Sequence, residues 1–408
     1  MIDEYRAVDE EIPNFELKKL FDREANWLAV PLEVSLKYCT NCKTCDKACH
    51  IYLSSKKEIY KPTYRAKILK KLKKQNKNSN LIELAYRCNL CMRCKLFCPL
   101  SLENGLIARE IRKFFSQEFG IAPKALHEGT VKQLNTGYHT GLSVDGFKNI
   151  VKFMEEDIAE RFGIEVKIPV DKKRAEILLI NNAGDFFSRI ECIESFVVIF
   201  EKAGLDWTLS SKGDAVNYGL WYDDFQYLRI VERHLEIARE LDVEKIVVGE
   251  CGHAHKALIP VESEIKRESY LPLLWKLVKE LELDPEKNNF PVTLHDPCNI
   301  VRKLGIVEPQ RKILKKVCSK FIEMNPNGIY NYCCGGGGGL AVIDSMRDFR
   351  IKVSTKMKFE QIMNALKNFP KKYVCAPCSN CKRVISEISE EIVCVGVVDL
   401  VANALIFD

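Results

Sequence analysis

The chain has no apolar segment long enough to cross a membrane. Its longest apolar run is Ile392–Phe407, which Asp399 interrupts, whereas a spanning helix needs about 20 residues. Met1–Glu11 is acidic and polar, unlike the basic and apolar start of a secretion signal. The only run of glycines, at 335–339, follows a cysteine pair and does not form the G-x-G-x-x-G dinucleotide fingerprint. We therefore expect a cytoplasmic chain that carries neither NAD nor flavin.

The charge is also nearly balanced, whereas cysteine is abundant. A net charge of +6 over 408 residues does not suggest nucleic-acid binding. The 18 cysteines do not fit a disulfide scaffold, which is typical of small secreted proteins. Clustered Cys-x-x-Cys pairs in a chain without a secretion signal indicate metal binding.

One cysteine spacing occurs twice near the N-terminus. The copies are Cys39-x-x-Cys42-x-x-Cys45-x-x-x-Cys49 and Cys88-x-x-Cys91-x-x-Cys94-x-x-x-Cys98. This is the spacing of bacterial ferredoxins, in which three cysteines of one run bind one [4Fe–4S] cluster and the fourth ligates the other. We therefore assign two cubane clusters, one to Cys39, Cys42, Cys45 and Cys98 and the other to Cys88, Cys91, Cys94 and Cys49.

A pair of zinc sites is the alternative, because zinc also uses Cys-x-x-Cys pairs. That interpretation leaves the third and fourth cysteines of each run without a role. His50 stands where the second run has Pro99, and we expect it on the surface.

Helical periodicity surrounds the two runs. Tyr64–Leu72, Leu81–Tyr86 and Leu106–Phe119 predict helices, and hence an α-helical two-cluster ferredoxin domain over residues 1–125. Lys56–Lys77 holds ten basic residues against one acid, Glu58. We interpret this stretch as a solvated helix face. The alternative is a docking surface for an acidic redox partner or an anionic membrane.

The most unusual stretch is Tyr332-Cys333-Cys334 followed by Gly335–Gly339. Adjacent thiols are strained as one disulfide but are well suited to hold a metal cluster. The glycines, above all Gly335, Gly336 and Gly337, allow positive φ and a close approach to a bulky group, and their N–H groups can point at anionic sulfur. A flexible linker with a chance cysteine pair is the alternative. Further cysteines, Cys298 and Cys378-x-x-Cys381, stand at orderly distances on both sides of the pair, which argues against a flexible linker.

These residues resemble the cysteine-rich CCG domain of the heterodisulfide reductase family, in its D-like form. The family includes disulfide-reducing subunits of methanogens, related subunits of membrane complexes in sulfate reducers, and iron–sulfur subunits of hydroxy-acid and glycerol-3-phosphate dehydrogenases. The resemblance implies a non-cubane [4Fe–4S] cluster held by five cysteines, namely Cys298, Cys333, Cys334, Cys378 and Cys381. Spacing alone indicates only a metal cluster.

Strands alternate with helices from residue 175 onward, which predicts parallel sheets in a multidomain α plus α/β chain. Turn residues mark 126–174 as a connector, and a long helix is expected after the glycines. The strand candidates are Glu176–Ile180, Lys245–Gly249, Val292–Leu294, Lys372–Val374 and Ile392–Val398.

The two α/β parts align with each other as a duplication. Val247–Ala254 lies over Tyr373–Cys381, and Asn217–Leu220 lies over Asn331–Cys334. The first half, residues 175–290, keeps Cys251 but has no cysteine pair. We expect it to be a degenerate CCG domain that forms one wall of the pocket at the second half, residues 291–408.

Three histidines have two interpretations each. His253, His255 and His295 are structural by default, or they donate a proton to a leaving thiolate. His253 and His295 are the preferred donors, because each follows a strand end that also presents a cysteine. His127 and His139 are expected to be surface or structural residues.

The remaining cysteines have no place in the three sets. Cys251 is either an extra ligand or a redox-active thiol, and Cys375 is either a spare thiol or a ligand. Buried apolar fillers are expected for the others, which are Cys192, Cys318 and Cys394.

Three functions fit these patterns. The first is the iron–sulfur catalytic subunit of a heterodisulfide reductase-like complex, which reduces or forms a disulfide and docks on a membrane cytochrome b or a soluble electron donor. The second is an iron–sulfur relay subunit of a flavin-dependent, quinone-linked dehydrogenase. The third, a zinc-stabilised nucleic-acid-binding module, would lack the brown colour of an iron–sulfur protein. We expect the first, on the cytoplasmic face of a membrane.

Overall fold

Short helices around cysteine loops make up the N-terminal part. The computed structural model describes residues 5–7, 37–65 and 79–407. The predicted helix Tyr64–Leu72 and the basic stretch Lys56–Lys77 lie largely outside the described residues. The other two predicted helices are confirmed. The elements here are η2 (Thr44–Ala48), α3 (His50–Ser55), η3 (Glu58–Tyr60), α5 (Ser79–Tyr86), α6 (Arg93–Leu96) and α7 (Asn104–Phe119), with β1 (Tyr5–Ala7) antiparallel to β2 (Ile121–Pro123).

The predicted connector contains two helices that the sequence analysis did not assign. They are α8 (Lys124–Thr136) and α9 (Val144–Phe162). Each buries one face, α9 through Phe147, Val151, Met154 and Ile158. The turn residues between them separate two amphipathic helices, so the segment is part of the folded body.

Two four-stranded parallel sheets follow, with the same strand order. The first runs β4-β3-β5-β6 and the second β8-β7-β9-β10. Equal topology supports the duplication and confirms the expected mixed α plus α/β fold. The strands are β3 (Ile177–Ile180), β4 (Trp207–Thr208), β5 (Lys245–Val248), β6 (Lys266–Ser269), β7 (Pro291–Leu294), β8 (Lys320–Ile322), β9 (Lys372–Cys375) and β10 (Ile392–Val395).

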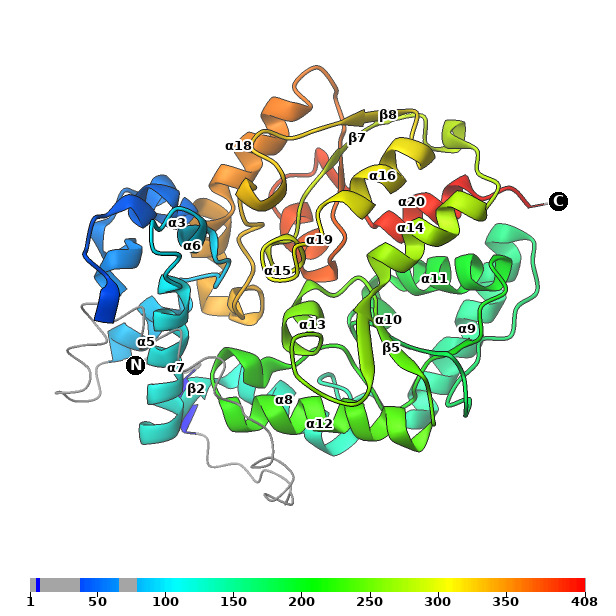
Figure 1. The fold of residues 1–408 in the computed structure, drawn as a ribbon, viewed down its shortest axis with the longest axis horizontal. Coiled ribbons are helices and arrows are strands. Elements are labelled where there is room, and N and C mark those ends of the chain that lie inside the picture. The colour runs from blue at the N-terminus through cyan, green and yellow to red at the C-terminus, as the bar shows by residue number, and fades with distance from the viewer. Residues whose placement is uncertain (1–4, 8–36, 66–78, 408) are drawn as a thin grey trace.

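Helices cover these sheets and meet at the centre of the molecule. Figure 1 shows α13, α15 and α19 close together between the two sheets. The helices of the first half are α10 (Asp185–Ser188), α11 (Ile190–Lys202), α12 (Asp224–Glu240), α13 (Gly252–Ala257) and α14 (Tyr270–Glu280), with the 3-10 turn η4 (Tyr218–Trp221). Those of the second half are α15 (Cys298–Val301), α16 (Glu308–Val317), α18 (Lys356–Ala365), α19 (Ser379–Ser386) and α20 (Val397–Ala404).

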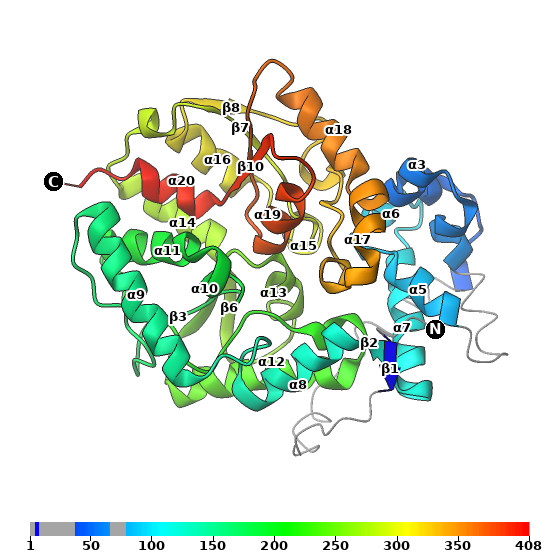
Figure 2. The same ribbon diagram turned by 180° about the vertical axis from the view of Figure 1, so that it is seen from behind.

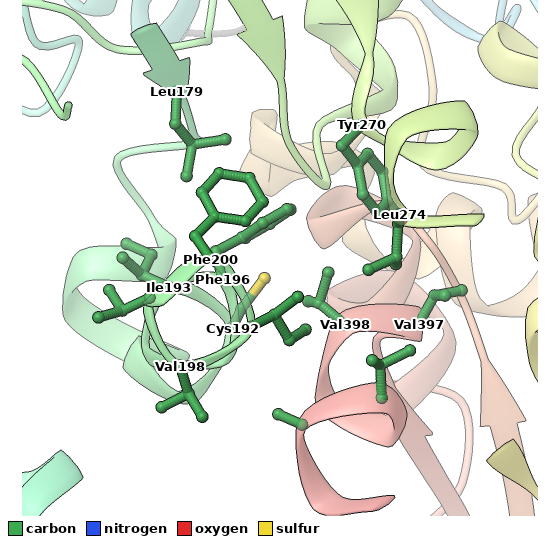
Figure 3. Close-up of a cluster of buried hydrophobic side chains, with 14 of the residues drawn as sticks. Leu179, Cys192, Ile193, Phe196, Val198, Phe200, Tyr270, Leu274, Val397 and Val398 are labelled. Atoms are coloured by element: carbon green, nitrogen blue, oxygen red, sulfur yellow. The ribbon is translucent and has the colours of Figure 1, made fainter. Parts of the chain in front are cut away.

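One hydrophobic core joins the two halves. Helix α11 of the first half packs on α20 of the second. Figure 3 shows Phe196 and Cys192 of α11 facing Val397 and Val398 of α20, with Tyr270 beside them. Cys192 is fully buried here, as expected, but it is not a purely apolar filler, because its Sγ donates to Glu250 Oε2 at 3.8 Å. The shared core fixes how the two halves face each other.

Two predicted elements differ in the structure. The long helix expected after the glycines is present but interrupted, since α17 (Arg347–Phe349) passes into a π-helical turn, η9 (Arg350–Ser354), before α18 (Lys356–Ala365) begins. The strand predicted at Ile392–Val398 ends at Val395, and α20 begins at Val397. A buried strand and a buried helix start are equally apolar, so periodicity did not separate them.

Among the described residues, no helix is both long and apolar enough to cross a membrane. Figure 2 shows the N-terminal part on one side of the molecule, next to α17 and α18, with the C-terminus at the opposite side.

Candidate metal centres

The first cysteine group surrounds a cavity of about 90 Å³. Cys39, Cys42, Cys45 and Cys98 line it together with neighbours such as Asn104. Asn41 and Lys43 adopt positive φ of 58° and 64°, which curls the loop around the cavity. The Asn104 side-chain amide donates to Cys45 Sγ at 3.3 Å. Cys42 is exposed, so this group reaches the surface.

The second group repeats this loop geometry in a buried setting. Leu90 and Met92 have positive φ of 50° and 61°. Burial raises the pKa of Cys94 well above its ordinary value, and the nearby Cys91, Cys88 and Cys49 raise it further. The buried guanidinium of Arg65 faces Cys88, Cys49 and Cys94. The structure therefore brings together the crossed sets expected from the spacing.

The loop that holds the second group lies directly on the glycine segment. A hydrogen bond between Cys333 and Cys91 lowers the pKa of Cys91. The Asn89 side-chain amide donates to the carbonyls of Gly335 at 2.8 Å and Gly337 at 3.1 Å. A Cβ at Gly337 would lie 2.8 Å from the Asn89 carbonyl oxygen. The glycines therefore permit this close contact as well as the approach to sulfur.

His50 is not on the surface, contrary to the expectation. It is 2% exposed, and its Nε2 hydrogen-bonds to Asn89 Oδ1 at 2.8 Å. Its Nδ1 lies 4.0 Å from Cys91 Sγ. The position after Cys49 is buried because the loop of the second run packs over it.

The third group gathers five buried cysteines at the carboxyl ends of β7 and β9. Cys298 opens α15, Cys378 precedes α19 and Cys381 lies within it, while Cys333 and Cys334 approach from the glycine segment. Hydrogen bonds with Cys333 and Cys381 hold the pKa of Cys334 well below its ordinary value. Sγ of Cys334, Sγ of Cys381 and a ring nitrogen of His295 lie within 4.8 Å of one another.

Backbone amides surround these sulfurs. Gly335 N donates to Cys333 Sγ at 3.4 Å, and Gly336 N donates to Cys334 Sγ at 3.5 Å. Gly335 has a φ of +97°, which favours glycine there. N–H donors stabilise thiolate sulfur. The convergence of free thiols makes the three groups fit iron–sulfur clusters, and these backbone donors add to the fit at the third group.

A cavity of about 530 Å³ opens onto the third group from between the two halves. Cys298, Cys334, Cys378 and Cys381 line it, as do His253, Trp221 and Tyr218 of the first half. Its charged residues are Arg189, Arg383 and the buried Asp185. Residues of the first half therefore form one wall of the cavity, as expected. A cavity of this size can hold a small organic ligand.

The candidate histidines occupy different environments. His253 lines the cavity, and burial lowers its pKa to about 3. Its Nε2 lies 2.6 Å from the Asn217 carbonyl, so neutral His253 uses its one N–H there. His255 hydrogen-bonds to Cys251 O and Ser269 Oγ, as a structural histidine does. His295 alone lies beside the cysteines of the third group.

His127 and His139 have structural contacts. His127 is buried beside Tyr222, and His139 Nδ1 pairs with Asp214.

The remaining cysteines are buried. Cys251 Sγ caps α13 by accepting from Ala254 N at 3.5 Å, and burial raises its pKa. Cys375 lies in the shared core, where burial also raises its pKa. Neither lines the cavity. Cys318 and Cys394 are buried as well, as expected for fillers.

Sequence reasoning missed three polar residues at the centres. They are Asn89, Asn331 and Lys358, which are 3%, 0% and 0% exposed. Each is a single polar residue whose neighbours in the sequence give no sign of burial. For Asn331, the alignment with Asn217 of the first half was the one feature of the sequence that could have indicated a structural role.

The chain is similar to known iron–sulfur proteins in both of its cysteine-rich parts. The model of the 4Fe-4S dicluster domain matches residues 35–102, and the model of the Cysteine-rich domain matches residues 292–386. The Hdr-like menaquinol oxidoreductase iron–sulfur subunit 2 of Archaeoglobus fulgidus is 24% identical over 90% of this chain and 79% of its own length.

Two further relatives bear on function. The D component of the dihydromethanophenazine:CoB–CoM heterodisulfide reductase of Methanosarcina acetivorans is 25% identical over 93% of this chain and 96% of its own length. The EtfAB:quinone oxidoreductase of Syntrophomonas wolfei is 26% identical over 63% of this chain and 37% of its own length. The chain therefore carries a 4Fe-4S dicluster domain and a cysteine-rich CCG domain, and it is similar over most of its length to the D subunit of heterodisulfide reductase and to Hdr-like iron–sulfur subunits.

Proposed function

We propose that the chain is the iron–sulfur catalytic subunit of a heterodisulfide reductase-like complex. The observation that carries this proposal is the cavity whose wall includes Cys298, Cys334, Cys378 and Cys381. It gives a small molecule access to the five-cysteine group, whereas a group that serves only as a relay needs no such opening. The reaction is the reduction of a disulfide to two thiols, or its reverse.

The three cysteine groups would hold two cubane clusters and one non-cubane [4Fe–4S] cluster. When bound, these clusters supply one-electron transfer, and cleavage of a disulfide consumes two electrons and two protons. The ligands are those assigned from the sequence, with Cys333, Cys334, Cys298, Cys378 and Cys381 at the reacting centre.

The order of the groups follows from contacts within the chain. Cys91 of the second group hydrogen-bonds to Cys333 of the third, whereas Cys42 of the first group is exposed. The first group is therefore where a redox partner meets the chain, and the second lies next to the substrate site. We propose a membrane cytochrome b or a soluble electron donor as that partner, with the chain peripheral on the cytoplasmic face.

Residues of both halves would bind and orient the substrate. Trp221 and Tyr218 offer apolar surface, and Arg189 and Arg383 offer positive charge. Burial raises the pKa of Asp185 to about 7, so this acid carries little negative charge below neutral pH. The cavity thus suits a thiol or disulfide with an anionic end. Of the two candidate proton donors, His253 lines the cavity but has its Nε2 at the Asn217 carbonyl. His295 lies beside Cys334 and Cys381 and is not among the residues that line the cavity.

A quinone-linked relay is the second candidate. The names of two relatives, a menaquinol oxidoreductase and an EtfAB:quinone oxidoreductase, favour it. In that case the chain accepts electrons from a flavoprotein or quinone partner and binds no disulfide.

Electron paramagnetic resonance on anaerobically purified, oxidised protein separates the two candidates. Oxidised cubane clusters are silent, so a signal that changes when a thiol is added supports disulfide chemistry at the five-cysteine group. The control is a matched alcohol in place of the thiol. A silent sample, with iron and sulfide for two cubanes only, would contradict the catalytic proposal and favour the relay.

A further inference from the structure

A chain of buried polar residues lies behind the five-cysteine group. His295 follows β7, Asn331 precedes Tyr332, and Lys358 belongs to α18. All three are 0% exposed. Buried polar side chains are costly unless they are hydrogen-bonded. The hydrogen bonds among these residues therefore determine which atom of each side chain donates and which accepts.

The orientation of the Asn331 amide is fixed from two sides. Lys358 Nζ donates to Asn331 Oδ1 at 2.5 Å, and Asn331 Nδ2 donates to the Asp296 carbonyl at 2.9 Å. An amine N–H donates and a carbonyl accepts, so a flipped amide would lose both bonds. Arg311 holds the Asp296 side chain at 2.8 and 2.6 Å, which fixes this part of the chain.

This orientation determines the tautomer of His295. Asn331 Nδ2 lies 3.4 Å from His295 Nδ1, so Nδ1 is the acceptor of an N–H. A ring with Nδ1 as acceptor carries its single proton on Nε2. Nε2 is buried and has no hydrogen-bond partner among the described residues.

The sulfurs of the third group lie next to the ring, since a ring nitrogen of His295 and the Sγ atoms of Cys334 and Cys381 are within 4.8 Å of one another. Cys334 is within hydrogen-bonding reach of the His295 ring, and Cys381 Sγ belongs to the same close group. A nitrogen that carries a proton cannot also donate a lone pair to a metal. Because the contact with Asn331 leaves the ring proton on Nε2, that nitrogen can act as a hydrogen-bond donor but not as a metal ligand.

We propose that Asn331 and Lys358 are positioning residues that hold His295 as an N–H donor to the cysteine sulfurs, and not as a metal ligand. The inference rests on the cluster proposed for the five cysteines. Hydrogen bonds to the sulfurs of an iron–sulfur cluster tune its reduction potential, because they stabilise the more negative, reduced form. The His295 N–H thus raises the potential of this group relative to a site without the donor.

Pulsed electron paramagnetic resonance on the complete protein tests this assignment. The oxidised signal is expected to show weak coupling to ¹⁴N and to a proton that exchanges in D₂O. Strong coupling from a directly bound imidazole nitrogen would overturn the inference while leaving the proposed function intact. Absence of the oxidised signal, with iron for two cubanes only, would instead remove the proposed cluster and this inference with it.

Variants test the positioning role through the midpoint potential. His295→Ala removes the N–H, and Asn331→Asp replaces the Nδ2 donor with an acceptor that attracts the ring proton to Nδ1. Both are expected to lower the potential of the five-cysteine group, and His295→Gln, which keeps a side-chain N–H, is expected to restore part of it. The potentials of the cubane groups serve as the internal control for folding.

Asn135→Asp is the matched control, since Asn135 is exposed on α8, and it should leave all potentials unchanged. If His295→Ala lowers the potential but Asn331→Asp does not, Asn331 has no positioning role. If neither variant changes the potential, the N–H does not reach the sulfurs.

Discussion

The backbone N–H of Gly252 donates a hydrogen bond to Cys378 Sγ at 3.3 Å. Gly252 belongs to the half that has no cysteine pair, and Cys378 belongs to the half that has the complete set. The first half therefore contributes a donor to the sulfur group as well as a wall to the cavity.

Substitution of Gly252 should disturb this contact. A Cβ at this position would lie 3.0 Å from Cys378 Sγ and 3.5 Å from Cys378 Cβ. We expect Gly252→Val to cost about 1–3 kcal/mol through overpacking and to alter the oxidised-state resonance of the five-cysteine group. The measurement is that spectrum, together with the iron content.

Gly105→Ala is the matched control, because its Cβ would meet its nearest neighbour, Leu90 Cα, at an ordinary 3.9 Å. An unchanged spectrum in Gly252→Val would show that the interface is looser than the structure indicates.

A buried ion pair holds the halves together beside the site. Lys382 Nζ lies 2.8 Å from Glu250 Oε2, and the two side chains are 1% and 0% exposed. Glu250 also accepts from Val397 N at 2.7 Å. We expect Lys382→Met to destabilise the protein by about 3–5 kcal/mol, since it leaves a buried carboxylate without its cation. Denaturant unfolding measures this change.

The control for this prediction is Lys352→Met. Lys352 and Asp348 form an exposed pair, 72% and 75% accessible, whose loss should change the free energy of unfolding by less than about 1 kcal/mol. Equal effects of the two substitutions would contradict the role given to Lys382.

The buried acid of the cavity predicts a pH dependence of stability. Burial raises the pKa of Asp185 from 3.8 to about 7, against the opposing effects of Lys382 and Ser379. The folded state therefore binds its proton more tightly than the unfolded state. The contribution of Asp185 is fully present below pH 4 and is lost as the pH rises to about 7, by roughly 4 kcal/mol at most.

Asp185→Asn should remove this dependence, so the variant loses less stability than the parent protein between pH 5 and pH 8. Unfolding curves at several pH values test it, with Asp348→Asn as a control at an exposed site. Parallel profiles for parent and Asp185→Asn would show that Asp185 ionises normally.

The two arginines of the cavity predict a preference for anionic thiols. Arg189 is half-buried and Arg383 is exposed, and they come from opposite halves. We expect 3-mercaptopropionate to change the oxidised-state resonance at about tenfold lower concentration than 2-mercaptoethanol, since a charge-assisted contact is worth about 1.5–3 kcal/mol. Titration of the signal with each thiol measures this ratio.

Replacement of both arginines with methionine should bring the ratio close to one, whereas Arg347→Met, at an exposed residue outside the cavity, should leave it unchanged. A ratio that survives the double substitution would place the charge recognition elsewhere.

The sequence by itself determined the chemistry of this protein, because iron–sulfur ligation requires several thiols within one short turn. Several cysteine spacings in the sequence meet this requirement, namely the runs from Cys39 and from Cys88, the pair Cys333-Cys334 and the group at Cys378. Alternation of apolar strands with helices likewise predicted the parallel sheets, and the residual likeness of the two halves predicted their common topology.

Only the tertiary structure decided which surfaces meet. His50 is buried because the loop at Asn89 packs over it, and α8 and α9 are part of the folded body because other elements cover their apolar faces. The partners of Asn331 come from the segment that follows β7 and from α18, about 30 residues away in the sequence on either side. Such burial depends on which distant segments pack against each other, so it cannot be predicted from local spacing and periodicity.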